Sequence, residues 1–324
     1  MKAAVQFADG LRIEDIEVPR PGPEEVLVKV RACGLNRADL SMLAGRAHGA
    51  HGGAGTVLGL EWSGVVEEVG ASVVDFAPGD RVMGSGKGAF ADYAVSDHGR
   101  VTKIPARTMS FEQAAALPVA LQTMHDAVVT NGRLRSGEAV LIQGASSGVG
   151  LMGLQIAKLL GAGLVIGTSS TAERRERLKD FGAQRSIDTM AADWPQQVME
   201  ATEHRGVDLI VDQLSGTQAI NNLRACALKA RIVNVGRLAR SRAEFDFDLH
   251  ALKRIEYIGV TFRTRTVEEV REINRRMRAD LGPAISDGRL SLPIDRCFAF
   301  AELRDALAYM ARNAHFGKIV VAMP

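Results

Sequence analysis

Cysteine is scarce in this chain: Cys33, Cys226 and Cys297 are widely separated among 324 residues, and no C-x-x-C pair occurs. This scarcity argues against a disulfide framework and against a thiolate zinc cluster. The N-terminal stretch MKAAVQFADG also lacks the long apolar segment of a signal peptide. We therefore expect a cytoplasmic protein whose thiols stay reduced.

Long apolar runs and a strong charge of either sign are also missing. No run approaches the roughly 18 apolar residues that cross a bilayer, so we expect no membrane partner. The formal net charge is +2 and basic residues are spread along the chain, which argues against a nucleic-acid partner. The densest basic run, residues 271–280, interleaves acids at helical spacing and is typical of a solvated helix face.

The chain is long enough for about two domains, and its texture changes near residue 122. Before that point, short runs rich in β-branched residues alternate with glycine and proline, which predicts strands and turns; these runs are residues 24–34, 60–70 and 79–84. The segment 44–59 has many glycines and no periodicity, so we expect a loop there.

From residue 122 onward, apolar runs alternate with helical patterns. AVLIQG, LVIGTS, VDLIVDQL, RIVNVG and IEYIGVTF read as strands, and residues 171–183 and 217–230 read as two of the intervening helices. Such alternation predicts βαβ units and a doubly wound parallel sheet. A long helix, a short strand and a final strand follow residue 263. We expect them to pack on the first segment, which predicts a discontinuous domain of residues 1–121 and 263–324 around a domain of residues 122–262.

The stretch LIQGASSGVG, residues 141–150, has the form of a strand that leads into a phosphate-binding turn and a helix. Read as Gly144-x-x-x-Gly148-x-Gly150, it resembles the motif of short-chain dehydrogenases. That family also uses a Tyr with a Lys four residues later, and none of the three tyrosines here has one. Read as Ala145-x-Ser147-x-x-Gly150, the stretch is a degenerate dinucleotide-binding turn.

Several further motifs support the second reading. GLNRADL (34–40), LGLEWSGVVEEVG (58–70), GDRV (79–82), ASSGVG (145–150) and GKIVV (317–321) occur in order across the chain. Together they resemble the medium-chain dehydrogenase/reductase superfamily, and within it the zinc-independent quinone oxidoreductase branch of zeta-crystallin. The resemblance implies an α/β fold: a Rossmann domain that binds NADP at residues 122–262, and a GroES-like, mainly β catalytic domain.

The turn offers backbone amides and a helix N-terminus to a pyrophosphate. Glycines there let the backbone approach the ligand and let the helix pack on the strand. We expect cofactor contacts from Ala145, Ser146, Ser147, Gly148, Val149 and Gly150.

Zinc ligands of the superfamily are replaced in this chain. The resemblance puts Asn36 where zinc-dependent members have a cysteine, and Leu60 where they have a histidine. A catalytic zinc needs about three protein ligands, so we expect no metal. His48 and His51 in the glycine-rich loop are more typical of solvated side chains than of a metal site. We expect Glu61 to be a structural hydrogen-bonding residue and Cys33 to be buried.

The cofactor expected is NADPH. About 20 residues past the last glycine, where NAD enzymes have a carboxylate, this chain has Ser169 and Ser170, and Arg174 and Arg175 follow. Hydroxyls and a guanidinium suit a 2′-phosphate. We assign the phosphate contact to Arg174. The alternative is that both arginines lie on a solvated helix face and pair with Glu173 and Glu176.

The resemblance also implies contacts with the rest of the cofactor. Asn36 and Thr123 are the expected catalytic residues beside the nicotinamide, although Thr123 could equally be a helix N-cap. Further cofactor contacts are expected from Gly236, Phe262, Arg263 and Lys318.

A tyrosine that relatives have near Ala47 or His48 is missing, and a proton donor is therefore not evident. His48, His51 and His125 are the substitutes. The predicted reaction is NADPH-dependent reduction of a small quinone by hydride transfer. The alternatives are an NADPH-dependent reductase of activated alkenes (2-alkenals, enones or enoyl thioesters) and a low-turnover, crystallin-like dinucleotide-binding protein. The family's habits also imply a homodimer.

Overall fold

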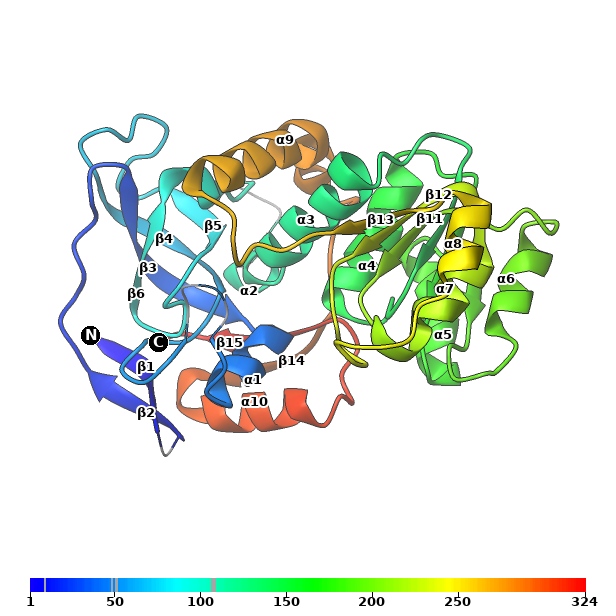
Figure 1. Cartoon of the computed structure of the whole chain (residues 1–324). Helices are drawn as coiled ribbons and strands as arrows, with labels where there is room; N and C mark the ends of the chain where they lie inside the picture. The colour runs from blue at the N-terminus through cyan, green and yellow to red at the C-terminus, as the bar shows by residue number, and fades with distance from the viewer. Residues whose placement is uncertain (9, 48, 50–51, 106–108) are drawn as a thin grey trace. The chain divides into compact units, whose positions relative to one another are not determined.

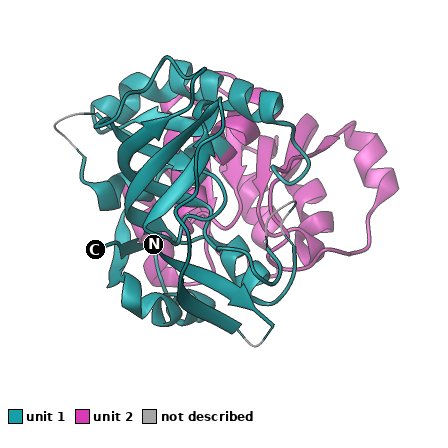
Figure 2. Ribbon diagram, turned by 90° about the vertical axis from the view of Figure 1, so that its left-hand side faces the viewer, with its two compact units in different colours: residues 1–122, 262–324 teal, residues 123–261 magenta. Residues whose placement is uncertain are grey.

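A computed structural model describes residues 1–8, 10–47, 49, 52–105 and 109–324 (Figure 1). The chain forms two units, coloured separately in Figure 2. Unit 1 comprises Met1–Gln122 and Phe262–Pro324, and unit 2 comprises Thr123–Thr261. The first boundary falls within helix α3 (Pro118–Met124), so one continuous helix carries the chain from the first unit into the second.

Unit 2 is a six-stranded parallel sheet in the order β10-β9-β8-β11-β12-β13. In chain order this is the 3-2-1-4-5-6 arrangement of dinucleotide-binding sheets, whose strand order reverses between the first and fourth strands. The strands are β8 (Ala139–Ile142), β9 (Leu164–Thr168), β10 (Arg185–Ile187), β11 (Val207–Asp212), β12 (Cys226–Asn234) and β13 (Glu256–Gly259). The helices include η2 (His125–Asn131, a π-helix), α4 (Gly148–Leu159), α5 (Ala172–Arg177), α6 (Trp194–Ala201), α7 (Ala219–Ala225) and α8 (Phe247–Lys253).

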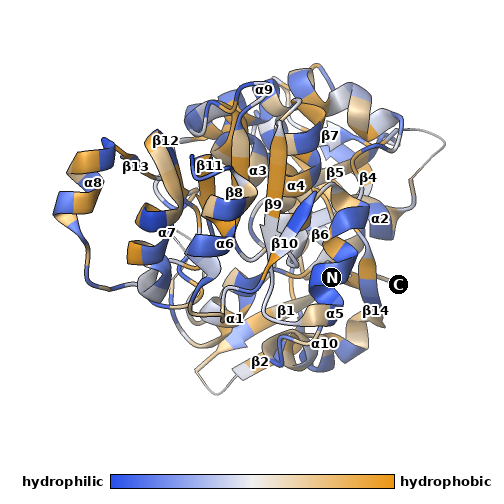
Figure 3. Cartoon of the chain, turned by 90° about the vertical axis from the view of Figure 1, so that its right-hand side faces the viewer, coloured by the Kyte–Doolittle hydropathy of each residue, from blue (hydrophilic) through white to orange (hydrophobic). Residues whose placement is uncertain are grey.

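Helices cover both faces of this sheet, whose central strands are made largely of hydrophobic residues (Figure 3). Leu141 clusters with Trp194 of α6 and Leu223 of α7. Ile142 points the other way, toward α4, where its side chain lies against Gly153. Strands buried on both faces read as continuous apolar runs. The predicted doubly wound parallel sheet is confirmed.

Two predicted element ends in unit 2 are wrong. The helix predicted for residues 217–230 ends at Ala225, and Cys226 begins β12. The Lys253 ammonium donates to the carbonyls of Leu223, Arg224 and Cys226 at 2.7–3.0 Å. It thereby satisfies carbonyls that a continuing helix would use, as basic residues do at helix C-termini. The strand predicted at 255–262 ends at Gly259.

Unit 1 is mainly β, as predicted. Its larger sheet has the order β14-β15-β3-β4-β5-β7, with β6 also paired to β3, and β1 and β2 form a separate hairpin. The strands are β1 (Lys2–Phe7), β2 (Gly10–Asp15), β3 (Glu25–Gly34), β4 (Glu61–Val69), β5 (Arg81–Ser85), β6 (Tyr93–Asp97), β7 (Val101–Lys103), β14 (Ile294–Ala299) and β15 (Lys318–Ala322). The helices include α1 (Arg37–Leu43), α2 (Phe111–Ala115), α9 (Val267–Ser286) and α10 (Leu303–Ala311).

The last sixty residues belong to unit 1 because strand β15 joins its sheet. Val320, Val321 and Ala322 pair antiparallel with Ala32–Gly34 at the end of β3. The helix α10, which was not predicted from the sequence, packs its buried leucines and methionine on the same core. This pairing brings Lys318, at the start of β15, close to the residues that follow β3.

Candidate functional site

The turn between β8 and α4 is held by Gly144 and its hydrogen bonds. Gly144 has φ of +66°, a left-handed conformation that favours glycine. Its N–H donates to Thr168 Oγ1 at 3.0 Å, and its carbonyl accepts from the Ser147 hydroxyl at 3.0 Å. Ala145, fully buried, donates its N–H to the Thr168 carbonyl at 2.8 Å. The turn is therefore fastened to the carboxyl end of β9.

Helix α4 begins immediately after this turn. The Ser147 hydroxyl caps it by accepting the Gly150 N–H at 3.0 Å. A Cβ on Gly150 would lie 2.6 Å from Ala145 Cα and 2.6 Å from the Gly144 carbonyl oxygen, so only glycine allows the helix to approach the turn so closely. The amides at this helix start and its positive dipole end favour a phosphate. These residues fit a dinucleotide pyrophosphate.

The end of β9 brings two predicted cofactor residues together. Ser169 follows β9, and its hydroxyl donates to the Ser146 hydroxyl of the turn at 3.1 Å. Ser170 is exposed, and Arg174 is half-buried on α5. Arg175 donates to the Ser169 carbonyl at 2.9 Å and forms an ion pair with Asp188 at 2.9 Å. This neighbour of Arg174 thus holds the strand end and neutralises the nearby carboxylate.

The carboxyl ends of β11 and β12 lie beside the same turn. Gln213 donates to the Gln143 carbonyl at 2.8 Å and accepts from the Ser147 hydroxyl at 3.3 Å. Gly236 follows β12, and a Cβ there would lie 2.4 Å from the Gln213 carbonyl oxygen. The Gly236 carbonyl accepts from the Ser215 hydroxyl at 2.7 Å. Predicted contact residue Gly236 is therefore packed against the strand end that also supports the turn.

The polar residues beneath the turn were not predicted from the sequence. Gln143, Thr168, Asn222 and Asp212 are all fully buried and hydrogen-bonded to one another in a chain. Burial raises the pKa of the Asp212 carboxyl, while N–H groups of Ser215, Leu214 and Asn222 oppose the rise. A signal was present: Gln143, Thr168 and Asp212 each directly follow a short run of apolar residues or glycine near the end of a strand.

Unit 1 holds a second polar group around Asn36. The Asn36 amide donates to Glu61 Oε1 at 2.8 Å, and its carbonyl oxygen accepts from the Lys318 ammonium at 3.2 Å. Lys318 also donates to the Leu35 carbonyl at 2.9 Å and to Glu61 Oε1. The second oxygen of Glu61 accepts the Val119 N–H at 2.9 Å. We call Asn36, Asp39, Glu61 and Lys318 the buried polar cluster; all four are at most 9% exposed.

Asp39 is the unusual member of this cluster. One of its oxygens accepts the Asn36 N–H at 2.7 Å, and the other has no hydrogen-bond partner among the described residues. Burial raises the pKa of Asp39 from 3.8 to about 7, with Glu61 adding to the rise and Asn36 and Lys318 opposing it. Burial likewise raises the pKa of Cys33 well above its usual value, and its thiol donates to the Ala89 carbonyl. The expectations for Glu61 and Cys33 are confirmed.

Three other predicted residues lie near the two points where the chain passes between units. Thr123 is in the last turn of α3, so the alternative of an N-cap is wrong. Phe262 and Arg263 lie in the turn after β13, not in the predicted strand. The backbone of Arg263 is so near Gly49, in the glycine-rich loop, that a Cβ on Gly49 would lie 2.6 Å from the Arg263 carbonyl oxygen.

The histidines proposed as proton donors have different outcomes. His125 is fully buried at the start of the π-helix η2. His48 and His51 lie outside the described residues.

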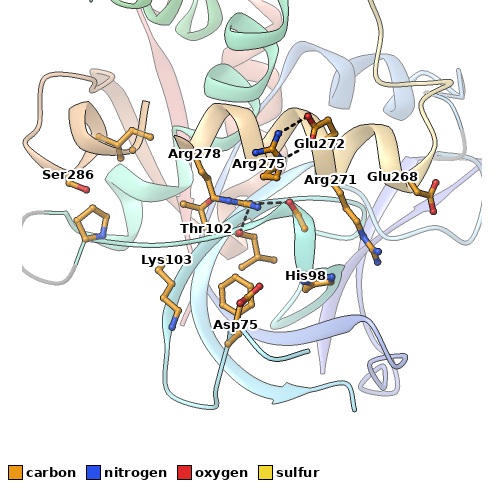
Figure 4. A pocket seen from close by; sticks show the side chains of 16 residues that line it. Asp75, His98, Thr102, Lys103, Glu268, Arg271, Glu272, Arg275, Arg278 and Ser286 are labelled. Carbon is orange, nitrogen blue, oxygen red and sulfur yellow. Dashed lines mark hydrogen bonds and ion pairs between the residues drawn. The ribbon is translucent and has the colours of Figure 1, made fainter. Parts of the chain in front are cut away.

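A cavity of about 720 Å³ in unit 1 lies between α9 and the segment from β7 to Pro105 (Figure 4). Its cations have structural partners: Arg271 is 2.5 Å from Asp97, and Arg275 is 2.7 Å from Glu272. Arg278 donates to the backbone carbonyl of Gly99, which precedes β7, at 3.1 Å and to that of Val101 in β7 at 3.0 Å. Only part of the run 271–280 is thus a solvated face, because Arg271 and Arg278 fasten α9 to the sheet. We assign this cavity no ligand.

No described helix is both long and apolar enough to cross a bilayer. Within the same residues, no three His, Cys, Asp or Glu side chains are grouped so as to hold a metal ion.

Two protein families match the chain. Residues 22–106 match the alcohol dehydrogenase GroES-like domain, and residues 148–278 match the zinc-binding dehydrogenase family. Quinone oxidoreductase of Rattus norvegicus is 31% identical over 260 residues, which cover 80% of this chain and 78% of that protein.

Longer proteins and solved structures are also similar. Mycocerosic acid synthase-like polyketide synthase of Mycobacterium tuberculosis is 28% identical over 94% of this chain, but the chain spans only 14% of that protein. The crystal structure of CurK enoyl reductase has a TM-score of 0.88 and 26% identity, and the match covers 100% of this chain and 99% of that one.

Proposed function

Because this chain belongs to the quinone oxidoreductase-like medium-chain dehydrogenase/reductases, we propose that it reduces small quinones with NADPH and without a metal. Proteins of this superfamily bind nicotinamide dinucleotides. The observation that carries the proposal is the turn at Gly144–Gly150, whose geometry fits a pyrophosphate on a sheet with dinucleotide-binding strand order.

The preference for NADPH rests on the end of β9. No carboxylate follows this strand; Ser169 does, with its hydroxyl 3.1 Å from Ser146. Two adjacent hydroxyls and the Arg174 guanidinium on α5 suit the charge of a 2′-phosphate. A carboxylate near the strand end, Asp188, is paired with Arg175. We therefore assign the 2′-phosphate to Ser169, Ser170 and Arg174.

The cofactor assignment has a direct test. We expect kcat/KM to be at least about tenfold higher with NADPH than with NADH, since about 1.4 kcal/mol of extra interaction corresponds to that factor. Arg174→Ala should raise KM for NADPH and leave that for NADH nearly unchanged. Arg177→Ala, on the same helix, is the matched control. Equal use of both cofactors by the wild type would contradict the assignment.

One matching family is described as zinc-binding. Metal independence is therefore proposed from the residues of this chain and not from the family match. Asn36 and Leu60 stand at the expected ligand positions. The buried Lys318 ammonium already bonds to Asn36 Oδ1 and to Glu61 Oε1. A zinc ion beside these oxygens would meet a fixed positive charge, and the remaining ligands are too few for a catalytic site.

Bound NADPH supplies a hydride, and the acceptor must then take a proton. A reduced quinone carries its negative charge on oxygen, which can be protonated by water, whereas a reduced alkene needs protonation at carbon and gains more from a positioned acid. No tyrosine stands near Ala47 in this sequence. Asn36, whose amide is held at both ends, is proposed to position the reacting groups, and its place beside the nicotinamide stays a prediction from the family resemblance.

Reduction of activated alkenes is the second candidate. It is favoured by the similarity to CurK enoyl reductase over the whole chain. Initial rates with NADPH on small aromatic quinones, 2-alkenals and enoyl thioesters separate the two. We expect quinones to react fastest and simple alcohols not at all, since the proposed metal-independent reaction has no Lewis acid to stabilise an alkoxide. Faster turnover of alkenals would favour the second candidate, and negligible turnover of everything would favour a crystallin-like role.

A homodimer is proposed from the edge of unit 2. Strand β13 is the last in the sheet order, and an unpaired strand edge is a template for pairing with a second copy. Tyr257 of β13 is 38% exposed, and Phe247, which belongs to the same aromatic cluster through Phe245, is 75% exposed. A second copy that pairs along β13 would cover them.

A further inference from the structure

The buried polar residues under the dinucleotide turn form a hydrogen-bond chain with one direction. Asp212 Oδ2 accepts from the Asn222 amide at 3.0 Å, and Asn222 Oδ1 accepts from the Gln143 amide at 2.9 Å. Gln143 Oε1 then accepts from the Thr168 hydroxyl at 2.9 Å. Finally, Thr168 Oγ1 accepts from the Gly144 N–H at 3.0 Å. This hydrogen-bond chain connects β11, α7, β8 and β9 to the turn.

We propose that Asp212 is a positioning residue for the cofactor: it sets the direction of this chain and so holds Gly144 in the conformation that presents the turn to the dinucleotide. This inference rests on the proposed NADPH binding. Asp212 itself touches neither the turn nor the ligand, and acts through Asn222, Gln143 and Thr168.

The donor-to-acceptor direction of the hydrogen-bond chain follows from the types of atoms that form it. Both oxygens of Asp212 accept: Oδ1 takes the N–H groups of Leu214 and Ser215 at 2.8–2.9 Å, and Oδ2 takes the Asn222 amide. An acceptor at this end forces Asn222 to present its NH2 group, and therefore its oxygen to Gln143. Gln143 must then accept from Thr168, which commits the only hydroxyl proton of Thr168 to Gln143.

The consequence for the turn is geometric. With its proton committed to Gln143, Thr168 Oγ1 presents a lone pair to the Gly144 N–H. Gly144 stays at φ of +66°, and its carbonyl stays within reach of the Ser147 hydroxyl that caps α4. An amide at position 212 removes the constraint. Its NH2 group would face that of Asn222, so Asn222 and Gln143 would have to turn over, and the Thr168 hydroxyl would lose its acceptor.

The first experiment compares D212N with the exchanged pair D212N/N222D. In the exchanged pair, the amide oxygen at position 212 still accepts the two N–H groups, and a carboxylate at position 222 accepts from both neighbours, so the direction is restored. We expect D212N to raise Kd for NADPH, measured by nicotinamide fluorescence, about tenfold, and the exchange to return it to within about threefold of wild type. The control is N221D, which adds a charge one residue away on α7.

A second pair of variants keeps the test decisive if D212N does not fold. T168V removes both the donor and the acceptor next to Gly144, and T168S keeps both. We expect T168V to raise Kd for NADPH about tenfold and T168S to bind like the wild type. In all folded variants, kcat at saturating NADPH should stay within about threefold of wild type, because the hydrogen-bond chain acts on cofactor binding. A purely structural role of the hydrogen-bond chain would lower Tm and leave Kd for NADPH unchanged.

The outcomes separate this inference from the proposed function. Wild-type Kd in folded D212N and T168V would overturn the inference, and so would an exchanged pair that binds no better than D212N. A wild-type protein that binds NADH as tightly as NADPH, with D212N weakening both, would support the inference and contradict the NADPH assignment. A wild type that binds neither dinucleotide would overturn both.

Discussion

Replacing Lys318 by methionine removes the one positive charge of the buried polar cluster while keeping a side chain of similar length. In the wild type the ammonium donates to Leu35 O, Asn36 Oδ1 and Glu61 Oε1, and the side chains of Lys318 and Glu61 are 4% and 0% exposed. Lys318→Met would leave the Glu61 carboxylate buried with neutral donors alone. Removal of one partner from a buried pair costs about 3–5 kcal/mol, a large share of a typical unfolding free energy of about 5–15 kcal/mol.

The two tryptophans allow this loss to be measured in unit 1. Trp62 is fully buried in unit 1, and Trp194 is buried in unit 2. In a W194F background, urea unfolding followed by fluorescence therefore reports on unit 1. The matched control is Lys103→Met: that ammonium is 2.9 Å from Asp80 on a side chain 57% exposed, and such exposed pairs contribute at most about 1 kcal/mol.

A double-mutant cycle separates the pair from simple loss of packing. In Lys318→Met/Glu61→Gln both charges are gone, so the double variant should lose several kcal/mol less than the sum of the single losses. Activity should fall in Lys318→Met even where the protein is folded, since Asn36 loses the donor that fixes its oxygen. A loss below about 1 kcal/mol for Lys318→Met, with additive effects in the cycle, would refute the reasoning.

Three further predictions concern stability, metal and assembly. Asp39→Asn should be more stable than the wild type at pH 8 in urea unfolding, because the folded-state pKa of Asp39 is raised from 3.8 to about 7. The wild type therefore loses roughly 4 kcal/mol of unfolding free energy, for about three pK units, as the pH rises from about 4 to about 7. Equal pH profiles of stability for the two proteins would contradict this. Purified protein should contain well under one zinc per chain by mass spectrometry and keep its rate in EDTA; a tightly bound equivalent of metal would show the ligand positions to be misassigned. Light scattering should give a dimer that Phe247→Glu, in the aromatic cluster that reaches Tyr257 of β13, converts to monomer, whereas a monomeric wild type would remove the basis for strand pairing.

The sequence alone was sufficient to identify the fold class and the dinucleotide turn. Both depend on local signals: continuous apolar runs that are buried on both faces of a parallel sheet, and small residues where a strand turns into a helix. Residues 139–150 contain the strand, the turn and the start of the helix in one stretch. Element ends were less predictable because tertiary contacts set them: α7 stops at Ala225, where Lys253 binds its last carbonyls.

The side chains that meet in the two polar clusters were decided by the tertiary structure. Glu61 and Lys318 are 257 positions apart, and β15 brings them together by pairing with β3. Asn36, predicted to lie beside the nicotinamide, is 9% exposed, and its amide is hydrogen-bonded at both its nitrogen and its oxygen. Gln143, Thr168 and Asp212 each follow a short run of apolar residues or glycine, but their connection through Asn222 depends on strand order and on the packing of α7. Local periodicity determines which residues are buried, whereas the partner of a buried polar atom is often far away in the sequence and is set by the tertiary fold.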